Sequence, residues 1–152
     1  YIYTVLLNHP MSIKYLGNSP EDGLPPLKIP YFLDRVPVGW PSPADDYIEH
    51  PIDLNEHLIK NPASTYFVRV NGDSMIDAHI GNGAILIVDR SIEPQHGKII
   101  IAIVDGAFTC KRILFRPTIC LTSANPNYPP IVLNNEEELE TAGTVITSIN
   151  IY

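Results

Sequence analysis

The chain has 152 residues and a formal net charge of −7, and this length suits one domain with a substantial hydrophobic core. The negative charge argues against direct binding of nucleic acid, because a surface that holds a phosphate backbone needs a basic stripe. No segment of the sequence approaches the roughly 18 consecutive apolar residues of a membrane-spanning helix, so we expect no membrane association.

The N-terminal part of the chain has the composition of an arm. Met11 resembles a natural start, and we therefore interpret residues 1–10 as an upstream extension. Seven prolines between residues 12 and 43 remove backbone donors and disfavour helix. We predict a flexible, extended arm over residues 11–43 and one folded domain over residues 44–152. The arm is too short to hold a DNA-binding helix-turn-helix domain.

One segment has a helical pattern. Residues 52–59 place apolar side chains on one face, and Pro62 ends the pattern. Asp53 and Asn55 are the candidate N-cap residues. We interpret this segment as a short packing helix that takes no part in chemistry.

The rest of the chain has the pattern of short β-strands. Gly, Pro and Asn separate these apolar segments at close spacing, which favours a compact, curled all-β domain over an α/β domain. We therefore predict a mostly β, barrel-like sheet. The predicted strands cover residues 66–70, 84–88, 98–104, 107–115, 118–122, 131–133 and 144–151.

A single serine follows the first of these strands. Residues 71–72 are an Asn-Gly pair, which favours a turn, and Ser74 comes directly afterwards between Asp73 and Met75. A serine in such a turn can present its hydroxyl and successive backbone N–H groups to one point, as an acyl-transfer nucleophile and its oxyanion hole require. Serine in a turn more often serves only the turn itself.

Lys111 lies in the middle of a predicted hairpin arm, after a two-residue Asp-Gly turn. Thr109 and Ile113 share its face, but the opposite face is equally apolar, so alternation does not decide which face is buried. If Lys111 points inward, desolvation lowers the pKa of its ammonium group and a neutral amine becomes available as a base. If it points outward, it is an ordinary charge on a sheet surface.

The sequence has no pattern of a metal or cofactor site. Cys110 and Cys120 lack the spacing of metal ligands, and we expect free thiols. The five histidines are scattered along the chain. We predict neither a metal nor a cofactor.

Three motifs in the same order carry a resemblance to a known family. They are residues 38–47 (VGWPSPADDY), residues 72–77 (GDSMID) and the strand that contains Lys111. Together they resemble the UmuD proteins, the LexA-related self-cleaving subunits of SOS mutagenesis polymerases, which are Ser-Lys peptidases of the S24 type. The resemblance covers residues 31–149 and implies a curled β-domain of the LexA/signal-peptidase type.

The resemblance implies a role for individual residues. Ser74 is the nucleophile, Lys111 is the general base, and the backbone N–H groups of Asp73 and Ser74 are the candidate oxyanion hole. The implied substrate is the protein's own arm, cut between Val38 and Gly39. Glycine suits a bend into a tight cleft. Val38 departs from the Ala or Cys that the family usually has, and its β-branched side chain is bulkier and stiffer.

The resemblance also implies partners. Cleavage is stimulated by a RecA-type recombinase filament on single-stranded DNA. The shortened protein acts as a homodimer and as the accessory subunit of a UmuC-like Y-family DNA polymerase in error-prone translesion synthesis. It is expected to be cytoplasmic and to need no cofactor.

Three alternatives remain open. Val38 is compatible with a non-cleaving structural polymerase subunit whose Ser–Lys dyad is vestigial. A signal-peptidase-like protease would share the chemistry, but the missing apolar span argues against it. The chain is also compatible with the C-terminal part of a LexA-type repressor.

Overall fold

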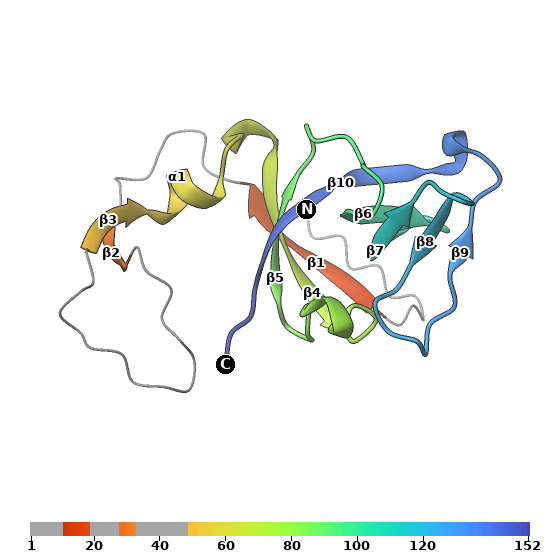
Figure 1. Cartoon of the computed structure of the whole chain (residues 1–152), viewed down its shortest axis with the longest axis horizontal. Coiled ribbons are helices and arrows are strands. Elements are labelled where there is room, and N and C mark those ends of the chain that lie inside the picture. Colours follow the sequence, from red (N-terminus) through yellow and green to blue (C-terminus); the bar gives the residue numbers. More distant parts are fainter. Residues whose placement is uncertain (1–10, 19–27, 33–48) are drawn as a thin grey trace.

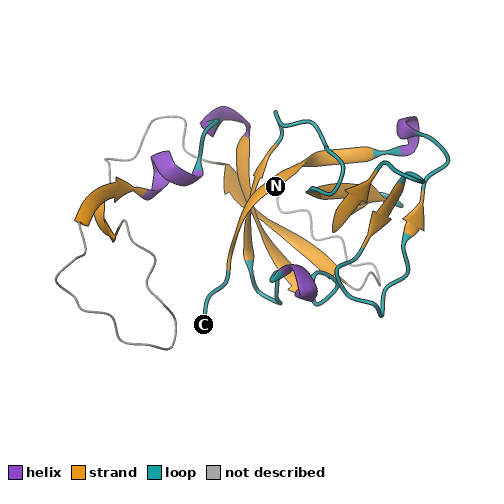
Figure 2. Cartoon of the chain, viewed as in Figure 1, coloured by secondary structure: helices purple, strands orange, loops and turns teal. Residues whose placement is uncertain are grey.

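The computed structural model describes residues 11–18, 28–32 and 49–152. Residues 1–10 and the predicted cleavage site, Val38 and Gly39, lie outside the described residues. The described part of the chain consists mainly of β-strands and loops, with one short α-helix and three 3₁₀ turns (Figure 2). The prediction of a mostly β fold is confirmed.

Ten strands make up this part of the chain: β1 (Met11–Asn18), β2 (Lys28–Phe32), β3 (Glu49–Asp53), β4 (Thr65–Gly72), β5 (Ile85–Asp89), β6 (Ile99–Val104), β7 (Ala107–Leu114), β8 (Cys120–Thr122), β9 (Ile131–Val132) and β10 (Glu140–Ile149). Eight of them form one sheet in the order β1-β4-β5-β10-β6-β7-β8-β9 (Figure 1). All neighbouring strands in it are antiparallel. Strands β2 and β3 pair separately.

The hairpin of β6 and β7 forms as predicted. Its two turn residues, Asp105 and Gly106, have φ angles of 51° and 76°, and positive φ at both positions is what a type I′ turn requires. The hairpin pairs Ile100 with Lys111. Lys111 and Ile113 are both buried on one face of β7, which settles the question that the sequence left open.

Strand β10 joins the two halves of the sheet. Its first half pairs with β6 and its second half with β5, and Figure 1 shows it running between those two regions. The register shifts near Gly143. A Cβ at Gly143 would lie 2.8 Å from Val88 Cγ1 and 2.9 Å from the Asp89 carbonyl oxygen. Glycine therefore allows β10 to approach β5 closely at this bulge.

The hydrophobic core has two parts. The two faces of β7 contribute to different parts, because side chains alternate across a strand. Cys110 packs in the first cluster, and Ile113, on the opposite face, packs in the second. The first cluster consists of Tyr66, Val68, Val70, Met75, Ile80, Ala84, Leu86, Val88, Ile101 and Cys110. The second consists of Ile100, Ala102, Ile113 and Leu121.

The sheet is curled but open. Strand β1 pairs with β4 and also approaches β7, so the β1 edge folds back towards the middle of the sheet. Strands β1 and β9 end the strand order of the described sheet. This arrangement confirms the predicted curled sheet, which forms an incompletely closed barrel.

Several elements differ from the sequence prediction, either in their boundaries or because the sequence did not predict them. The helix α1 covers Leu54–Leu58, because residues 52–53 belong to β3. Asp53 is its N-cap and accepts a hydrogen bond from the Asn55 N–H at 2.9 Å. Strand β10 begins at Glu140, four residues earlier than the predicted start at Thr144. Strand β1 was not predicted, because the proline content of residues 12–43 obscured the proline-free segment at its start.

Candidate active site

Ser74 lies in the turn that follows β4. It is 0% exposed, and the next element is the 3₁₀ turn Ile76–Ala78. The Ile76 N–H donates to the Asp73 carbonyl oxygen at 3.1 Å, while the Gly72 N–H donates to Asn82 Oδ1 at 2.9 Å. Hydrogen bonds on both sides of Ser74 therefore fix the position of its backbone.

Lys111 reaches Ser74 from the middle of β7. Its side chain is 5% exposed, and its Nζ lies 3.2 Å from Ser74 Oγ, within hydrogen-bonding distance. The two residues are 37 positions apart in the sequence. The structure thus brings together the nucleophile and the base that were predicted from the sequence.

The surroundings of Lys111 favour its neutral form. Burial lowers the pKa of the Lys111 ammonium below its ordinary value of 10.5, because desolvation penalises the charged form, while the charge of Cys110 opposes this. Burial also raises the pKa of the Cys110 thiol to about 12, although Lys111 lowers it. Near neutral pH the thiol is therefore uncharged and the opposing effect is absent. The Lys111 amine therefore loses its proton, and becomes available as a base, at a lower pH than the amine of an exposed lysine does.

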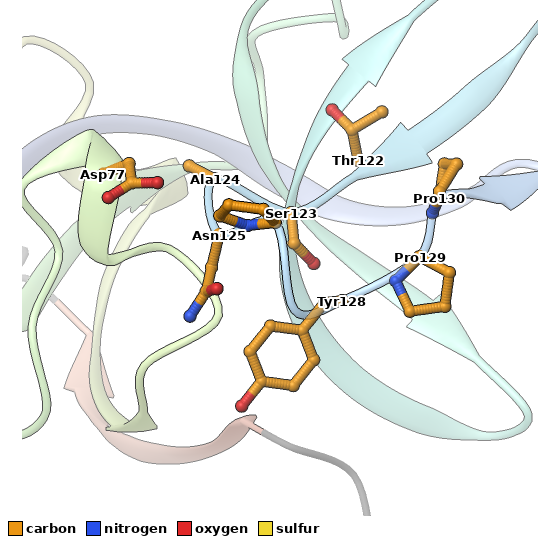
Figure 3. A pocket seen from close by; sticks show the side chains of 9 residues that line it. Asp77, Thr122, Ser123, Ala124, Asn125, Tyr128, Pro129 and Pro130 are labelled. Atoms are coloured by element: carbon orange, nitrogen blue, oxygen red, sulfur yellow. The ribbon is translucent and has the colours of Figure 1, made fainter.

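The loop between β8 and β9 holds the serine turn in place (Figure 3). The Tyr128 hydroxyl donates to the Asp73 carboxylate, and this hydrogen bond raises the pKa of Tyr128. The Asn125 Nδ2 donates to the Asp73 carbonyl oxygen at 3.1 Å, and the Asp77 N–H donates to the Ala124 carbonyl oxygen at 2.9 Å. No local sequence pattern predicts this contribution, because the Pro and Asn residues of segment 123–130 indicate only a connection between strands.

Hydrogen bonds to the Asp73 carbonyl oxygen orient one of the predicted oxyanion donors, the Ser74 N–H. Two donors, the Ile76 N–H and the Asn125 Nδ2, bind the carbonyl oxygen of Asp73. Because the peptide unit is planar and trans, the Ser74 N–H points away from that oxygen. The Ser74 N–H therefore points away from the side on which Asn125 binds the Asp73 carbonyl oxygen. The role of the Asp73 and Ser74 N–H groups as an oxyanion hole stays a prediction.

Two cavities adjoin these residues. We call the first the dyad cavity, with a volume of about 210 Å³; it is lined by Val104, Thr109, Lys111, Ser123, Tyr128, Pro129 and Ile131. The second, the loop cavity, measures about 460 Å³ and shares Ser123, Tyr128 and Pro129 with the first (Figure 3). The dyad cavity has mainly apolar walls beside the amine. It can therefore receive an apolar side chain beside the Lys111 amine.

The described residues also bear on what a metal site, a membrane-spanning helix and a disulfide require. Across residues 52–152, no three His, Cys, Asp or Glu side chains gather as a metal site would require. The same part of the chain has no helix with the length and apolar character to cross a membrane. Cys110 and Cys120 are free thiols.

Comparison with known proteins identifies the family. The model of the family described as Peptidase S24-like matches residues 30–146, which is most of the chain and includes both Ser74 and Lys111. The chain therefore belongs to the Peptidase S24-like family, whose members are classified as serine-type peptidases.

Curated relatives narrow the assignment. Protein MucA of Salmonella typhimurium is 40% identical over 122 residues, which cover 80% of this chain and 84% of the relative. Protein SamA of Salmonella typhimurium LT2 is 44% identical over 121 residues, with the same coverage. Protein ImpA of Salmonella typhimurium is 47% identical over 108 residues, or 70% of this chain and 74% of the relative. The resemblance to UmuD-like proteins is confirmed.

Proposed function

We propose that this protein is a UmuD-like SOS mutagenesis protein that cleaves its own N-terminal arm with a Ser74–Lys111 dyad. The observation that carries the proposal is the 3.2 Å contact between Lys111 Nζ and Ser74 Oγ. Both side chains are buried, and burying a lysine costs free energy. A lysine with a lowered pKa beside a candidate nucleophile is therefore a reason to expect catalysis.

The reaction begins with Lys111 as a neutral amine. It accepts the proton of Ser74 while Ser74 Oγ attacks the carbonyl carbon of Val38. The N–H groups of Asp73 and Ser74 stabilise the resulting oxyanion. The bond to Gly39 then breaks, Lys111 returns the proton to the new Gly39 amine, and the arm remains as an ester on Ser74. Water hydrolyses this ester and releases the arm.

The dyad cavity suits the side chain that precedes the scissile bond. Val104, Pro129 and Ile131 supply apolar walls beside Lys111, and Val38 is an apolar residue. Val38 is bulkier at Cβ than the Ala or Cys that is usual in the family, and its χ1 angle is restricted. The expected consequence is slow cleavage, because the carbonyl must still reach the oxyanion donors.

The relatives support a proposal for the cellular role. MucA, SamA and ImpA place the chain among UmuD-like proteins. We therefore assign the shortened homodimer to a UmuC-like Y-family polymerase as its accessory subunit, acting in the cytoplasm. A RecA-type filament on single-stranded DNA is the proposed stimulus for cleavage.

Val38 favours one alternative, a non-cleaving structural subunit. A vestigial dyad needs neither a buried amine nor an aligned hydroxyl, so the geometry of Lys111 and Ser74 supports the cleaving form. A piece of a LexA-type repressor would be cleaved by the same chemistry. The reading frame upstream of residue 1 distinguishes that case, because a repressor carries a DNA-binding domain there.

The direct test is self-cleavage of the purified chain at alkaline pH, followed by N-terminal analysis and intact mass. The proposal requires a fragment that begins at Gly39. Ser74→Ala is the matched control and should remain intact under the same conditions. An uncleaved wild-type chain would support the structural subunit instead.

A further inference from the structure

The hydroxyl of Ser123 has an unusual environment. Ser123 lies just after β8, and its Oγ is buried but has no hydrogen-bond partner among the described residues. A buried hydroxyl without a partner costs free energy, and native proteins rarely keep one without a reason. The neighbouring Thr122 shows the usual arrangement, because its hydroxyl donates to the Arg112 carbonyl oxygen at 3.3 Å.

The position of Ser123 connects this hydroxyl with the dyad. Ser123 lines the dyad cavity together with Lys111, and it also lines the loop cavity. Figure 3 shows the Ser123 hydroxyl pointing towards the side chains of Tyr128 and Pro129. Both cavities are lined by these two residues. The unpartnered hydroxyl therefore borders the space that also contains the amine of Lys111.

We propose that Ser123 positions the water molecule that hydrolyses the acyl-enzyme. A buried water needs room and at least two polar partners, and this cavity offers the Ser123 hydroxyl and the Lys111 amine in about 210 Å³. The inference rests on the proposed self-cleavage, because only a covalent ester on Ser74 requires such a water. Ser123 touches neither the nucleophile nor the scissile bond in this scheme, so it is a positioning residue.

The step that Ser123 assists balances as follows. The water oxygen attacks the carbonyl carbon of the ester between Val38 and Ser74, and Lys111 takes a proton from the water. The bond from that carbon to Ser74 Oγ then breaks, and Lys111 gives the proton to Ser74 Oγ. The arm leaves with a carboxyl group at Val38, and both members of the dyad return to their starting state.

The experiment separates formation of the ester from its hydrolysis. Cleavage within one chain yields an acyl-enzyme with the same mass as the intact protein, but with a new amine at Gly39. Acid-quenched samples from a time course at one alkaline pH are therefore analysed twice, for the Gly39 N-terminus and for the released arm. Hydroxylamine identifies the ester, because it frees the arm as a hydroxamate.

Ser123→Ala should form the Gly39 N-terminus at a rate within about twofold of wild type and release the arm about tenfold more slowly, since a displaced reacting atom costs roughly one to two orders of magnitude. Ser123→Cys, close in size but a weak hydrogen-bonding group, should show the same split. Thr122→Val removes a neighbouring hydroxyl outside the dyad cavity and should leave the ratio of the two rates unchanged. The melting temperature of Ser123→Ala should not fall, because the hydroxyl that it loses is unpartnered.

Release of the arm in step with the Gly39 N-terminus in Ser123→Ala would overturn the assignment while leaving the proposed function intact. An equal slowing of both steps would also overturn it, because Ser123 would then act on the substrate or on Lys111 before the ester forms. A wild-type chain that forms neither product would refute the proposed function, and this inference with it.

Discussion

Two ionisable side chains, Asp89 and Lys111, are both almost completely shielded from solvent, but the surroundings of Asp89 favour its charged form and those of Lys111 favour its neutral form. Asp89 is 1% exposed and Lys111 is 5% exposed. Asp89 accepts four hydrogen bonds, from Ser64 Oγ at 2.7 Å, from the N–H and Oγ of Ser91 at 2.8 and 2.6 Å, and from Asn61 Nδ2 at 2.6 Å. For Lys111 the described residues provide one hydrogen bond, to Ser74.

The number of hydrogen-bond partners decides which charge state the surroundings of each side chain favour. Burial raises the pKa of Asp89, but the hydrogen bonds from Ser91, Asn61 and Ser64 outweigh it and lower the pKa from 3.8 to about 2. Burial lowers the pKa of Lys111 and nothing among the described residues compensates for it near neutral pH. A site with many hydrogen-bond donors thus favours the charged form of a carboxylate, whereas a site with few partners favours the neutral form of an amine.

The largest expected effect is at Lys111. Lys111→Ala removes the proposed base and should slow self-cleavage by at least about a thousandfold, equivalent to about 4 kcal/mol of activation free energy. Lys98→Ala removes an exposed lysine just before β6 and should leave the rate within about twofold, as expected of a surface change away from the site. The rate of appearance of the Gly39 N-terminus measures both. Comparable slowing in the two variants would assign no special role to the buried lysine.

A smaller effect is expected at Asp89. Asp89→Asn replaces an acceptor of four donors by a group that presents its own donors, and it should lower the free energy of unfolding by about 2 kcal/mol at neutral pH. Because the folded pKa lies below the unfolded one, the contribution of Asp89 is complete above pH 3.8 and disappears as the pH falls towards about 2. Denaturant unfolding at several pH values measures this window.

Asp105→Asn is the control for that experiment. Asp105 lies exposed in the β6–β7 turn with a positive φ angle, which asparagine tolerates. Its substitution should change stability by no more than about 0.5 kcal/mol. A loss in Asp89→Asn that did not shrink on acidification would show that its hydrogen bonds do not act through the charge.

The next effect concerns the residues of the proposed cleavage site, Val38 and Gly39. Val38→Ala should accelerate self-cleavage about tenfold, because a smaller and less restricted side chain lets the carbonyl reach the oxyanion donors. Gly39→Glu should block cleavage by placing a bulky charge at the scissile bond. Time courses of wild type and Val38→Ala at one alkaline pH provide the comparison. Equal rates would mean that the cavity already accommodates valine.

The smallest effect concerns stability at the dyad. Lys111→Met should raise the free energy of unfolding by about 1 kcal/mol at neutral pH, since it removes the cost of burying an amine whose folded pKa lies below its unfolded value. The sign follows from linkage: that cost is largest below the folded pKa and vanishes as the pH rises towards 10.5. A gain that grew with pH would contradict the lowered pKa.

The sequence allowed much of the fold to be predicted, and part of the site. Period-two alternation and the Asp-Gly turn located most strands of the main sheet, because both signals are local. The buried face of β7 could not be predicted, since Lys111 and Cys110 lie on opposite faces that are both buried. The pairing of Ser74 with Lys111 came from the family resemblance, and only the three-dimensional fold shows the distance between them.

The contribution of the β8–β9 loop could not be predicted for a related reason. Tyr128 and Asn125 bind Asp73 across 55 and 52 residues of sequence, and no local pattern reports contacts at that separation. The same limit applies to Ser123. Its hydroxyl is notable because it is buried without a hydrogen-bond partner, and only the folded structure shows this. Polar residues in a proline-containing loop otherwise indicate only a connection between strands.

The most direct test of the central claim, that a buried neutral lysine activates Ser74, is the pH dependence of self-cleavage in the wild-type chain. The rate of appearance of the Gly39 N-terminus should rise with pH as the neutral fraction of Lys111 grows, and should level off at a pH below 10.5. A rate that is independent of pH, that falls above neutrality, or that levels off only above 10.5 would contradict the account.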